Sequence, residues 1–290
     1  MSDAGRARDV GGAATTAGDD VGIRCRLDGV LEGVLEGVPD GTVAEVVLER
    51  PARLNTLDPA ALRALRGIFE DLAGAEGLRG VLLRGEGRAF CAGRDISGVD
   101  PTTDDAEAFL RDLVHPVLAA VRAVPVPVVA AVQGAALGIG LGLAASADVV
   151  YAGTSVKVGS PFARIGAVLD SGGHALLVDR LGPHRAMDLM VTGELLDGEE
   201  AARVGLVSRC VPDDELLPRA RAVLAALAEG PTQAFVASKR IVADLRARRG
   251  QDDALLEAEA RAQGAAAATR DYAEGFTAFQ EKRPPHFAGR

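Results

Sequence analysis

Two glycine-containing segments of this 290-residue chain could present backbone amides to a ligand. Ala92 and Gly93 lie in the segment 88–95, RAFCAGRD, where small side chains let a ligand approach the main chain closely. The segment 133–142, QGAALGIGLG, is expected to open a helix, and the first amides of a helix have no partner within it. Two amides that converge on one oxygen form an oxyanion hole, which stabilises an enolate or a tetrahedral intermediate.

An acid, Asp170, follows in the segment 168–173, VLDSGG. Its apolar neighbours predict desolvation, which raises the pKa of a carboxyl group toward that of a useful base. An Asp before Ser-Gly-Gly and an apolar helix is also typical of a helix N-cap. The residues alone therefore leave two roles open for Asp170, proton transfer and capping.

The glycine spacing at 138, 140 and 142 has other interpretations when it is taken alone. A dinucleotide site or close helix packing would produce a similar pattern. The segment nevertheless lacks the final glycine of the nucleotide motif, and no acid follows at the distance expected for ribose binding. A nucleotide-dependent oxidoreductase remains an alternative that a test of NAD(P) binding would decide.

Composition limits the class of protein. A hydrophobic content of 48% supports a substantial core, and a net charge of −9 disfavours nucleic acid and anionic membranes as partners. The uncharged stretch between Arg122 and Asp148 contains prolines and glycines, which favour a buried strand and helix over a membrane span. The three cysteines are widely spaced and form no metal-binding pattern, so we expect a cytoplasmic protein without metal.

The elements that must position these residues alternate between strands and helices. Strands are expected at 43–48, 80–84, 126–132 and 148–151. Helices are expected at 59–72, with Asp58 as its cap and Pro59 at its first position, at 104–124 and from about 137. Such alternation predicts an α/β fold with a mostly parallel sheet covered by helices. We therefore expect a flexible tail at 1–20, a core at 21–212 and a helical oligomerisation region at 213–290, with 29–41 as a hairpin or surface insertion.

Four motifs in order resemble the crotonase family, the enoyl-CoA hydratases and isomerases. They are ERPARLNTL at 49–57, GRAFCAGRD at 87–95, PVVAAVQGAALGIGLGLAASAD at 127–148 and IGAVLDSGG at 165–173. Further agreement at 181–193, 200–208 and 274–283 extends the resemblance over 43–287. It implies a crotonase-like spiral of ββα units with a helical C-terminal trimerisation region, a homotrimer or a dimer of trimers, and a CoA thioester as substrate without a permanently bound cofactor.

The resemblance also implies the site residues. The oxyanion amides would be those of Ala92 and Ile139, where Ile139 replaces the usual glycine without removing the amide. The residues expected along CoA are Arg53, Leu54, Asn55, Ala92, Gly93, Arg94 and Asp95. Phe279 and Lys282 resemble residues that reach the nucleotide end of CoA in a neighbouring subunit.

The reaction depends on which acids are present. Hydratases of this family divide proton transfer between two glutamates, and here the motifs align those positions with Gly142 and Phe162, neither of which transfers a proton. One carboxylate suffices for double-bond isomerisation, so the sequence favours an isomerase with Asp170 as the proton shuttle. The alternatives are a hydratase with non-standard acid–base residues and a non-catalytic acyl-CoA-binding homologue.

Overall fold

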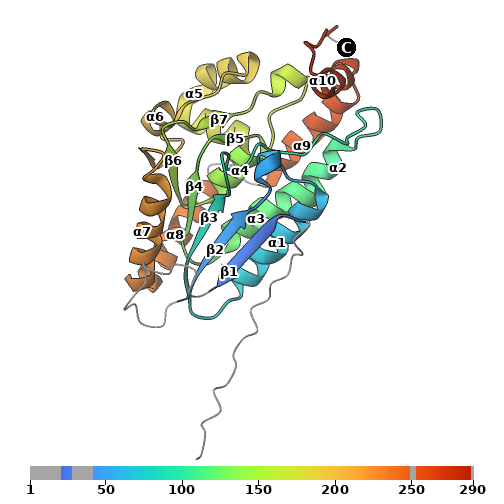
Figure 1. Cartoon of the computed structure of the whole chain (residues 1–290). Coiled ribbons are helices and arrows are strands. Elements are labelled where there is room, and N and C mark those ends of the chain that lie inside the picture. The colour runs from blue at the N-terminus through green and yellow to red at the C-terminus, as the bar shows by residue number, and fades with distance from the viewer. Residues whose placement is uncertain (1–20, 28–41, 249–252, 289–290) are drawn as a thin grey trace, which may run out of the picture.

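The computed structural model describes residues 21–27, 42–248 and 253–288. The predicted tail at 1–20 and the predicted insertion at 29–41 lie outside the described residues. Within those residues, six strands form one sheet in the order β1-β2-β3-β4-β6-β8 (Figure 1). Their bounds are Ile23–Leu27, Thr42–Leu48, Leu78–Gly85, Val128–Val132, Val149–Gly153 and Arg209–Val211. Only β1 is antiparallel to its neighbour in this sheet, which confirms the mostly parallel arrangement.

A second, smaller layer crosses the ends of this sheet. Its paired strands are β5 (Ala135–Leu137) and β7 (Lys157–Gly159). Two isolated parallel bridges extend this layer, one between Cys91 and Ala136 and one between Arg94 and Leu57. Each of four strands of the large sheet is thus followed by a short extended segment of the small layer. A helix follows that segment, so the chain repeats a ββα unit, as the resemblance implies.

Local sequence features determine where the helices of the first units begin and where they are interrupted. Asp58 accepts a hydrogen bond from the Ala61 amide at 2.8 Å, and Pro59 occupies the first turn of α1 (Pro59–Ala73), as predicted. The predicted helix at 104–124 is instead divided into α2 (Ala106–Phe109), a π-helical turn (Leu110–Val114) and α3 (His115–Ala123). Pro116 lacks an amide and its ring crowds the preceding turn, so the wider π-turn accommodates it.

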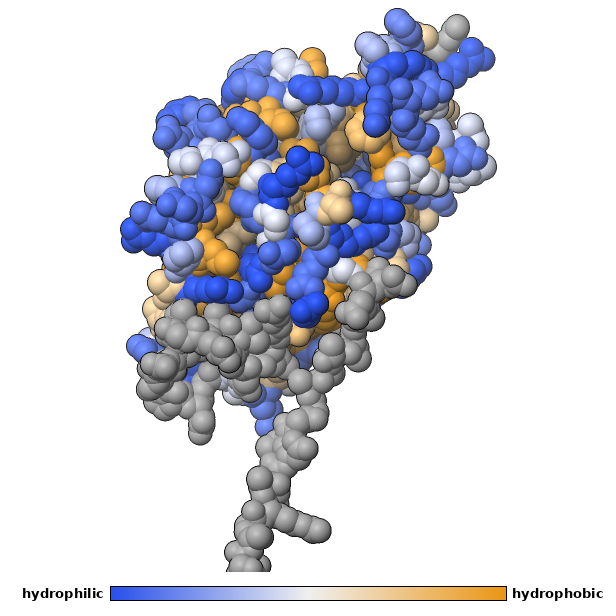
Figure 2. Space-filling model, in the orientation of Figure 1, coloured by the Kyte–Doolittle hydropathy of each residue, from blue (hydrophilic) through white to orange (hydrophobic). Residues whose placement is uncertain are grey.

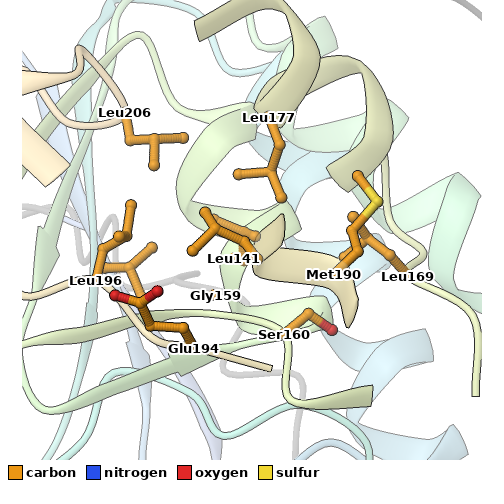
Figure 3. A pocket seen from close by; sticks show the side chains of 11 residues that line it. Leu141, Gly159, Ser160, Leu169, Leu177, Met190, Glu194, Leu196 and Leu206 are labelled. Carbon is orange, nitrogen blue, oxygen red and sulfur yellow. The ribbon is translucent and has the colours of Figure 1, made fainter. Parts of the chain in front are cut away.

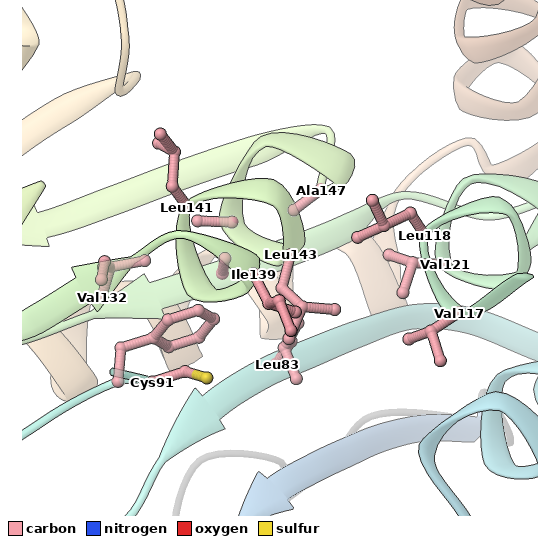
Figure 4. Close-up of a cluster of buried hydrophobic side chains, with 14 of the residues drawn as sticks. Leu83, Cys91, Val117, Leu118, Val121, Val132, Ile139, Leu141, Leu143 and Ala147 are labelled. Atoms are coloured by element: carbon pink, nitrogen blue, oxygen red, sulfur yellow. The ribbon is translucent and has the colours of Figure 1, made fainter. Parts of the chain in front are cut away.

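The predicted helix at about 137 begins two residues later, as α4 (Ile139–Ser146), because Ala135–Leu137 pairs as β5. α4 is enclosed by the main core cluster. Figure 4 shows Leu143 of α4 facing Leu83 of β3, with Val117 and Leu118 of α3 beside them. This packing on all sides fixes the position of the helix start.

The chain continues as α5 (Gly173–Thr192), α6 (Gly198–Arg203), α7 (Leu216–Glu229), α8 (Thr232–Arg248), α9 (Asp253–Ala267) and α10 (Arg270–Gln280). The described part of the region from 213 onward is therefore helical, as predicted. α7 covers the face of the large sheet opposite α1 and α3, where Leu224 packs in a second cluster with Leu82 and Val129. Hydrophobic side chains gather below α10 on the face in view (Figure 2). No helix in the described part of the chain is long and apolar enough to span a bilayer.

Candidate active site

A cavity of about 810 Å³ lies where the small layer meets α2, α9 and α10. All but two of the predicted site residues line it, namely Arg53, Leu54, Ala92, Gly93, Arg94, Asp95, Ile139, Asp170 and Phe279. These residues come from parts of the chain more than 200 positions apart, and the ββα spiral brings them together. The volume suits a substantial organic ligand.

Asn55 and Lys282 are the two predicted site residues that do not line this cavity. The Asn55 side chain is 1% exposed, donates to the carbonyls of Ala89 at 2.7 Å and Glu86 at 3.0 Å, and accepts from the Arg50 amide at 2.8 Å. Asn55 therefore holds the 50–57 turn together and does not face the cavity. Lys282 is exposed just beyond α10, and its contact with the CoA of a neighbouring subunit stays a prediction.

The backbone amide of Ala92 is occupied within the fold. It donates to the Leu54 carbonyl at 3.0 Å, which contradicts its predicted role as an oxyanion donor. The next amide, that of Gly93, donates to the Cys91 thiol. The motif could not reveal this, because the partner of the Ala92 amide lies in a distant segment and Gly93, with a φ of +97°, changes the direction of the chain immediately after Ala92.

The amide of Arg94 points the other way. Leu57 donates to the Gly93 carbonyl at 2.9 Å and accepts from the Asp95 amide at 3.0 Å, so Arg94 is the middle residue of a parallel bridge. In such a bridge the N–H of the middle residue points away from its partner. Among the described residues, the Arg94 amide donates to no backbone oxygen. It is therefore the amide of this segment that can meet a ligand.

The second amide lies at the start of α4. Gly138 is the N-cap, and the first bond of the helix runs from the Gly142 amide to the Gly138 carbonyl at 3.0 Å, which leaves the Ile139 amide without a partner in the helix. The two segments approach closely at Gly93, which has a φ of +97°. A Cβ there would lie 2.9 Å from the Leu137 carbonyl oxygen and 3.9 Å from the Ile139 nitrogen, so the approach requires glycine.

Asp170 is buried in the wall of the same cavity, with 5% of its surface exposed. Its Oδ1 accepts a hydrogen bond from the Ser171 hydroxyl at 2.7 Å. The N-cap of α5 is Gly172 and no side chain of its own segment caps that helix, so the capping interpretation of Asp170 is wrong. Burial raises the pKa of Asp170 to about 7, against the opposing hydrogen bond from Ser171.

The side chain of Arg94 is turned into the wall. Its guanidinium donates two hydrogen bonds to Asp104, at 2.8 and 2.6 Å, and lies 3.8 Å from the centre of the Phe109 ring. The Tyr272 hydroxyl donates to the same Asp104 carboxylate at 2.7 Å. This network was not predicted, because Asp104 and Tyr272 are 168 residues apart and neither belongs to a motif.

The two positions expected to carry glutamates in a hydratase have no acid and, at one of them, no room. A Cβ on Gly142 would lie 2.6 Å from the Ser171 Cβ and 2.7 Å from the Ser171 carbonyl oxygen. Phe162 lies over the helix start, with its ring 2.7 Å from where a Gly138 Cβ would be, and lines the cavity. The site therefore lacks the two-glutamate arrangement.

Other parts of the described structure offer weaker sites. A cavity of about 10 Å³ lies between α4 and α5, where Leu141, Leu177 and Leu206 converge (Figure 3). It has room for about one water molecule and cannot hold a substrate. No cluster of His, Cys, Asp and Glu suited to a metal ion occurs in the part of the chain that the structure describes.

Comparisons with known proteins show what this chain is similar to. The family model described as enoyl-CoA hydratase/isomerase matches residues 39–290. A probable enoyl-CoA hydratase of Rhodobacter capsulatus is 40% identical over 86% of this chain and 95% of its own length. The 1,2-epoxyphenylacetyl-CoA isomerase of Escherichia coli is 33% identical over 86% of this chain and 95% of its own length. The crystal structure of an enoyl-CoA hydratase from Mycobacterium avium subsp. paratuberculosis superimposes with a TM-score of 0.78 at 31% identity, covering 92% of this chain and 98% of that one.

Proposed function

Because this chain belongs to the enoyl-CoA hydratase/isomerase family, the crotonase family, we propose that it moves a double bond in an acyl-CoA thioester with Asp170 as the proton shuttle. The observation that carries this proposal is a buried carboxyl group, with a pKa of about 7, in the wall of the cavity that the Arg94 and Ile139 segments also line. A base of this kind next to two amide donors suits enolate chemistry.

The reaction needs one base and no water. Asp170 removes a proton from a carbon next to the double bond, and the electrons move onto the thioester oxygen to give a dienolate. The amides of Arg94 and Ile139 donate to that oxygen while its negative charge exists. The protonated Asp170 then returns the proton to the far carbon of the dienolate, so the double bond has moved and the enzyme is restored.

Incubation of the protein with a 3-enoyl-CoA thioester tests this proposal. We expect a conjugated 2-enoyl product of unchanged mass, detected by its ultraviolet absorbance and by mass spectrometry. A hydratase with non-standard acids would convert a 2-enoyl-CoA to a product heavier by one water, and a non-catalytic homologue would bind the thioester without turnover. Either of those results would contradict the isomerase proposal.

The pH dependence of kcat/KM should reveal Asp170 directly. The active form of a base is the deprotonated one, so activity rises with pH as Asp170 loses its proton, around pH 7 in the free enzyme. At one pH unit below that pKa we expect kcat/KM to be about a tenth of its plateau. A rise centred near pH 4, where an ordinary exposed Asp titrates, would contradict this assignment.

An aromatic acyl group is a second candidate for the substrate. The chain has eight Phe, two Tyr and no Trp, and five of these ten rings line the cavity of about 810 Å³: Phe109, Phe162, Tyr272, Phe276 and Phe279. Aromatic side chains favour flat, apolar partners. A relative named 1,2-epoxyphenylacetyl-CoA isomerase supports the same substrate class. We propose that the enzyme isomerises arylacyl-CoA thioesters through the same oxyanion hole.

A matched pair of thioesters tests this preference. An aryl-substituted enoyl-CoA should have a lower KM than a straight-chain enoyl-CoA of the same carbon number. Phe162→Leu should raise the KM of the aryl thioester by up to about tenfold, because a ring–ring contact is lost, and should change that of the alkyl thioester little. Equal effects on both thioesters would exclude an aromatic contact at Phe162.

A further inference from the structure

The loop between Gly166 and Gly172, which carries Asp170, has few hydrogen bonds of its own. Ser171 and Gly172 have positive φ angles of 60° and 81°, which interrupts any regular backbone pairing. The Gly173 amide donates to the Asp170 carbonyl at 2.9 Å. Such a loop must be held from outside if the carboxylate is to keep one position.

Two side chains of α9 supply the missing partners. Gln263 Oε1 accepts a hydrogen bond from the Val168 amide at 2.7 Å, and Glu259 Oε2 accepts one from the Gly172 amide at 2.7 Å. These bonds lie two residues before and two residues after Asp170. Because residues four apart share one face of a helix, a single face of α9 holds the loop on both sides of the carboxylate.

Glu259 also satisfies the start of α5. Its Oε1 accepts from the His174 amide at 3.1 Å, and His174 Nδ1 lies 2.8 Å from the same oxygen. Glu259 is 3% exposed and Gln263 is 6% exposed. A buried carboxylate is stabilised by amide donors and by the positive end of a helix, so α5 receives its cap from α9.

Glu259 also contributes to the charge around Asp170. The groups that act on the Asp170 carboxyl are Ser171 in its own loop, Arg94 in the oxyanion segment, His174 on α5 and Glu259 on α9. Burial is the main reason that the pKa of Asp170 is raised, and the Glu259 carboxylate adds to it, whereas Ser171, Arg94 and His174 oppose it.

We propose that Glu259 and Gln263 are positioning residues for Asp170, so that α9 is part of the catalytic apparatus as well as of the predicted oligomerisation region. This inference rests on the proposed role of Asp170 as the base. Gln263 only fixes the position of the loop, because it is neutral and binds one amide. Glu259 fixes the position of the loop and also acts through charge, because it binds two amides and its carboxylate raises the pKa of Asp170.

Substitution of Glu259 by Gln tests the double role. The variant places an amide group where two backbone N–H groups need acceptors, and it removes a negative charge near Asp170. We expect kcat to fall roughly 10- to 100-fold, because a displaced base transfers the proton more slowly. KM should change little, because the contacts that bind the substrate are kept. The acidic limb of the pH profile should move to lower pH by roughly half a unit or more. A purely structural role would not move that limb.

Gln263 provides two complementary variants. Gln263→Leu removes the bond to Val168 without a change in charge, so kcat should fall while the acidic limb stays in place. Gln263→Glu keeps an acceptor for Val168 and adds a negative charge, so the limb should move to higher pH, opposite to E259Q. Glu257→Gln is the matched control on α9, because Glu257 lies 3.5 Å from Arg111 and away from the loop. It should behave as the parent.

Hydrogen exchange measured by mass spectrometry gives a readout that does not need activity. Amides of residues 168–174 should exchange faster in E259Q and Q263L than in the parent, whereas those of α7 should be unchanged. Parent-like exchange, kcat and pH profile in E259Q and Q263L, with an inactive D170N, would overturn the role of α9 and leave the proposed function standing. Full turnover by D170N would instead overturn the proposed function, and the exchange data would still decide whether α9 holds the loop.

Discussion

Asp170→Asn should lower kcat for double-bond migration by about 10³-fold, the largest effect that we expect from a single substitution. Asn has nearly the same shape as Asp, and its carbonyl oxygen can accept the hydrogen bond that the Ser171 hydroxyl now donates at 2.7 Å. The loop should therefore keep its conformation while it loses the only group in the proposal that carries the proton. The measurement is kcat with a 3-enoyl-CoA, together with the affinity for the thioester by calorimetry.

The matching controls separate chemistry from binding. The thioester affinity of D170N should stay close to that of the parent, because the amide donors and the cavity are unchanged. Ser171→Ala, which removes only the hydroxyl, should cost far less activity, because the base remains. An active D170N, or one that has lost its affinity for the thioester, would contradict a specific role in proton transfer.

The same substitution should change how stability depends on pH. Burial raises the pKa of Asp170 from its usual 3.8 to about 7, so the folded state holds this proton more tightly than the unfolded state does. The parent should therefore lose stability as pH rises from about 4 to about 7, and D170N should lack that component. Thermal unfolding of both proteins across this range tests the sign, and identical pH dependence would argue against the raised pKa.

Ile139→Pro should lower kcat/KM by about 10²-fold, because it deletes one of the two proposed oxyanion donors. Proline is well tolerated at the first position of a helix, where its missing N–H has no intrahelical partner to lose. The residue before it, Gly138, has φ 53° and ψ −113°, the mirror image of the extended conformation that precedes proline and one that glycine adopts readily. The substitution therefore removes the amide while disturbing the helix start little.

Ile139→Val is the control for the side chain. Ile139 is 2% exposed and belongs to the main core cluster, so any smaller residue weakens packing. Valine weakens packing but keeps the amide, and its kcat/KM should stay within about threefold of the parent value. Equal losses in the two variants would show that packing matters at this position and that the amide does not. Circular dichroism and thermal unfolding establish that both variants are folded.

Sequence reasoning was accurate where the signal is local. Asp58 followed by Pro59 predicted the start of α1, because a side-chain acceptor and a missing amide both suit a helix N-terminus. It was less accurate for β5, β7 and β8, which have three residues each and are too short to show a period. The predicted helix at 104–124 was divided because Pro116 disturbs the hydrogen bonding of the preceding turn.

The site shows the same division. Asp170, Gly93 and Ile139 could be found because each belongs to a motif of small or apolar residues close together in the chain. Glu259 and Gln263 could not, because two polar residues four apart on a helix are typical of a solvated face. Only their burial against the loop 168–174 distinguishes them.

The sequence by itself determined the family, the alternation of strands and helices, the absence of the two glutamates and the presence of an acid at 170. The tertiary structure decided which amide of the segment 91–95 is available, and it selected Arg94 over Ala92. The physical reason is that the neighbouring segment decides which backbone N–H groups are occupied, and that Gly93, with a φ of +97°, interrupts the regular alternation of N–H directions between Ala92 and Arg94. That neighbour, the 54–57 turn, lies about 40 residues earlier, and only the fold brings the two segments together.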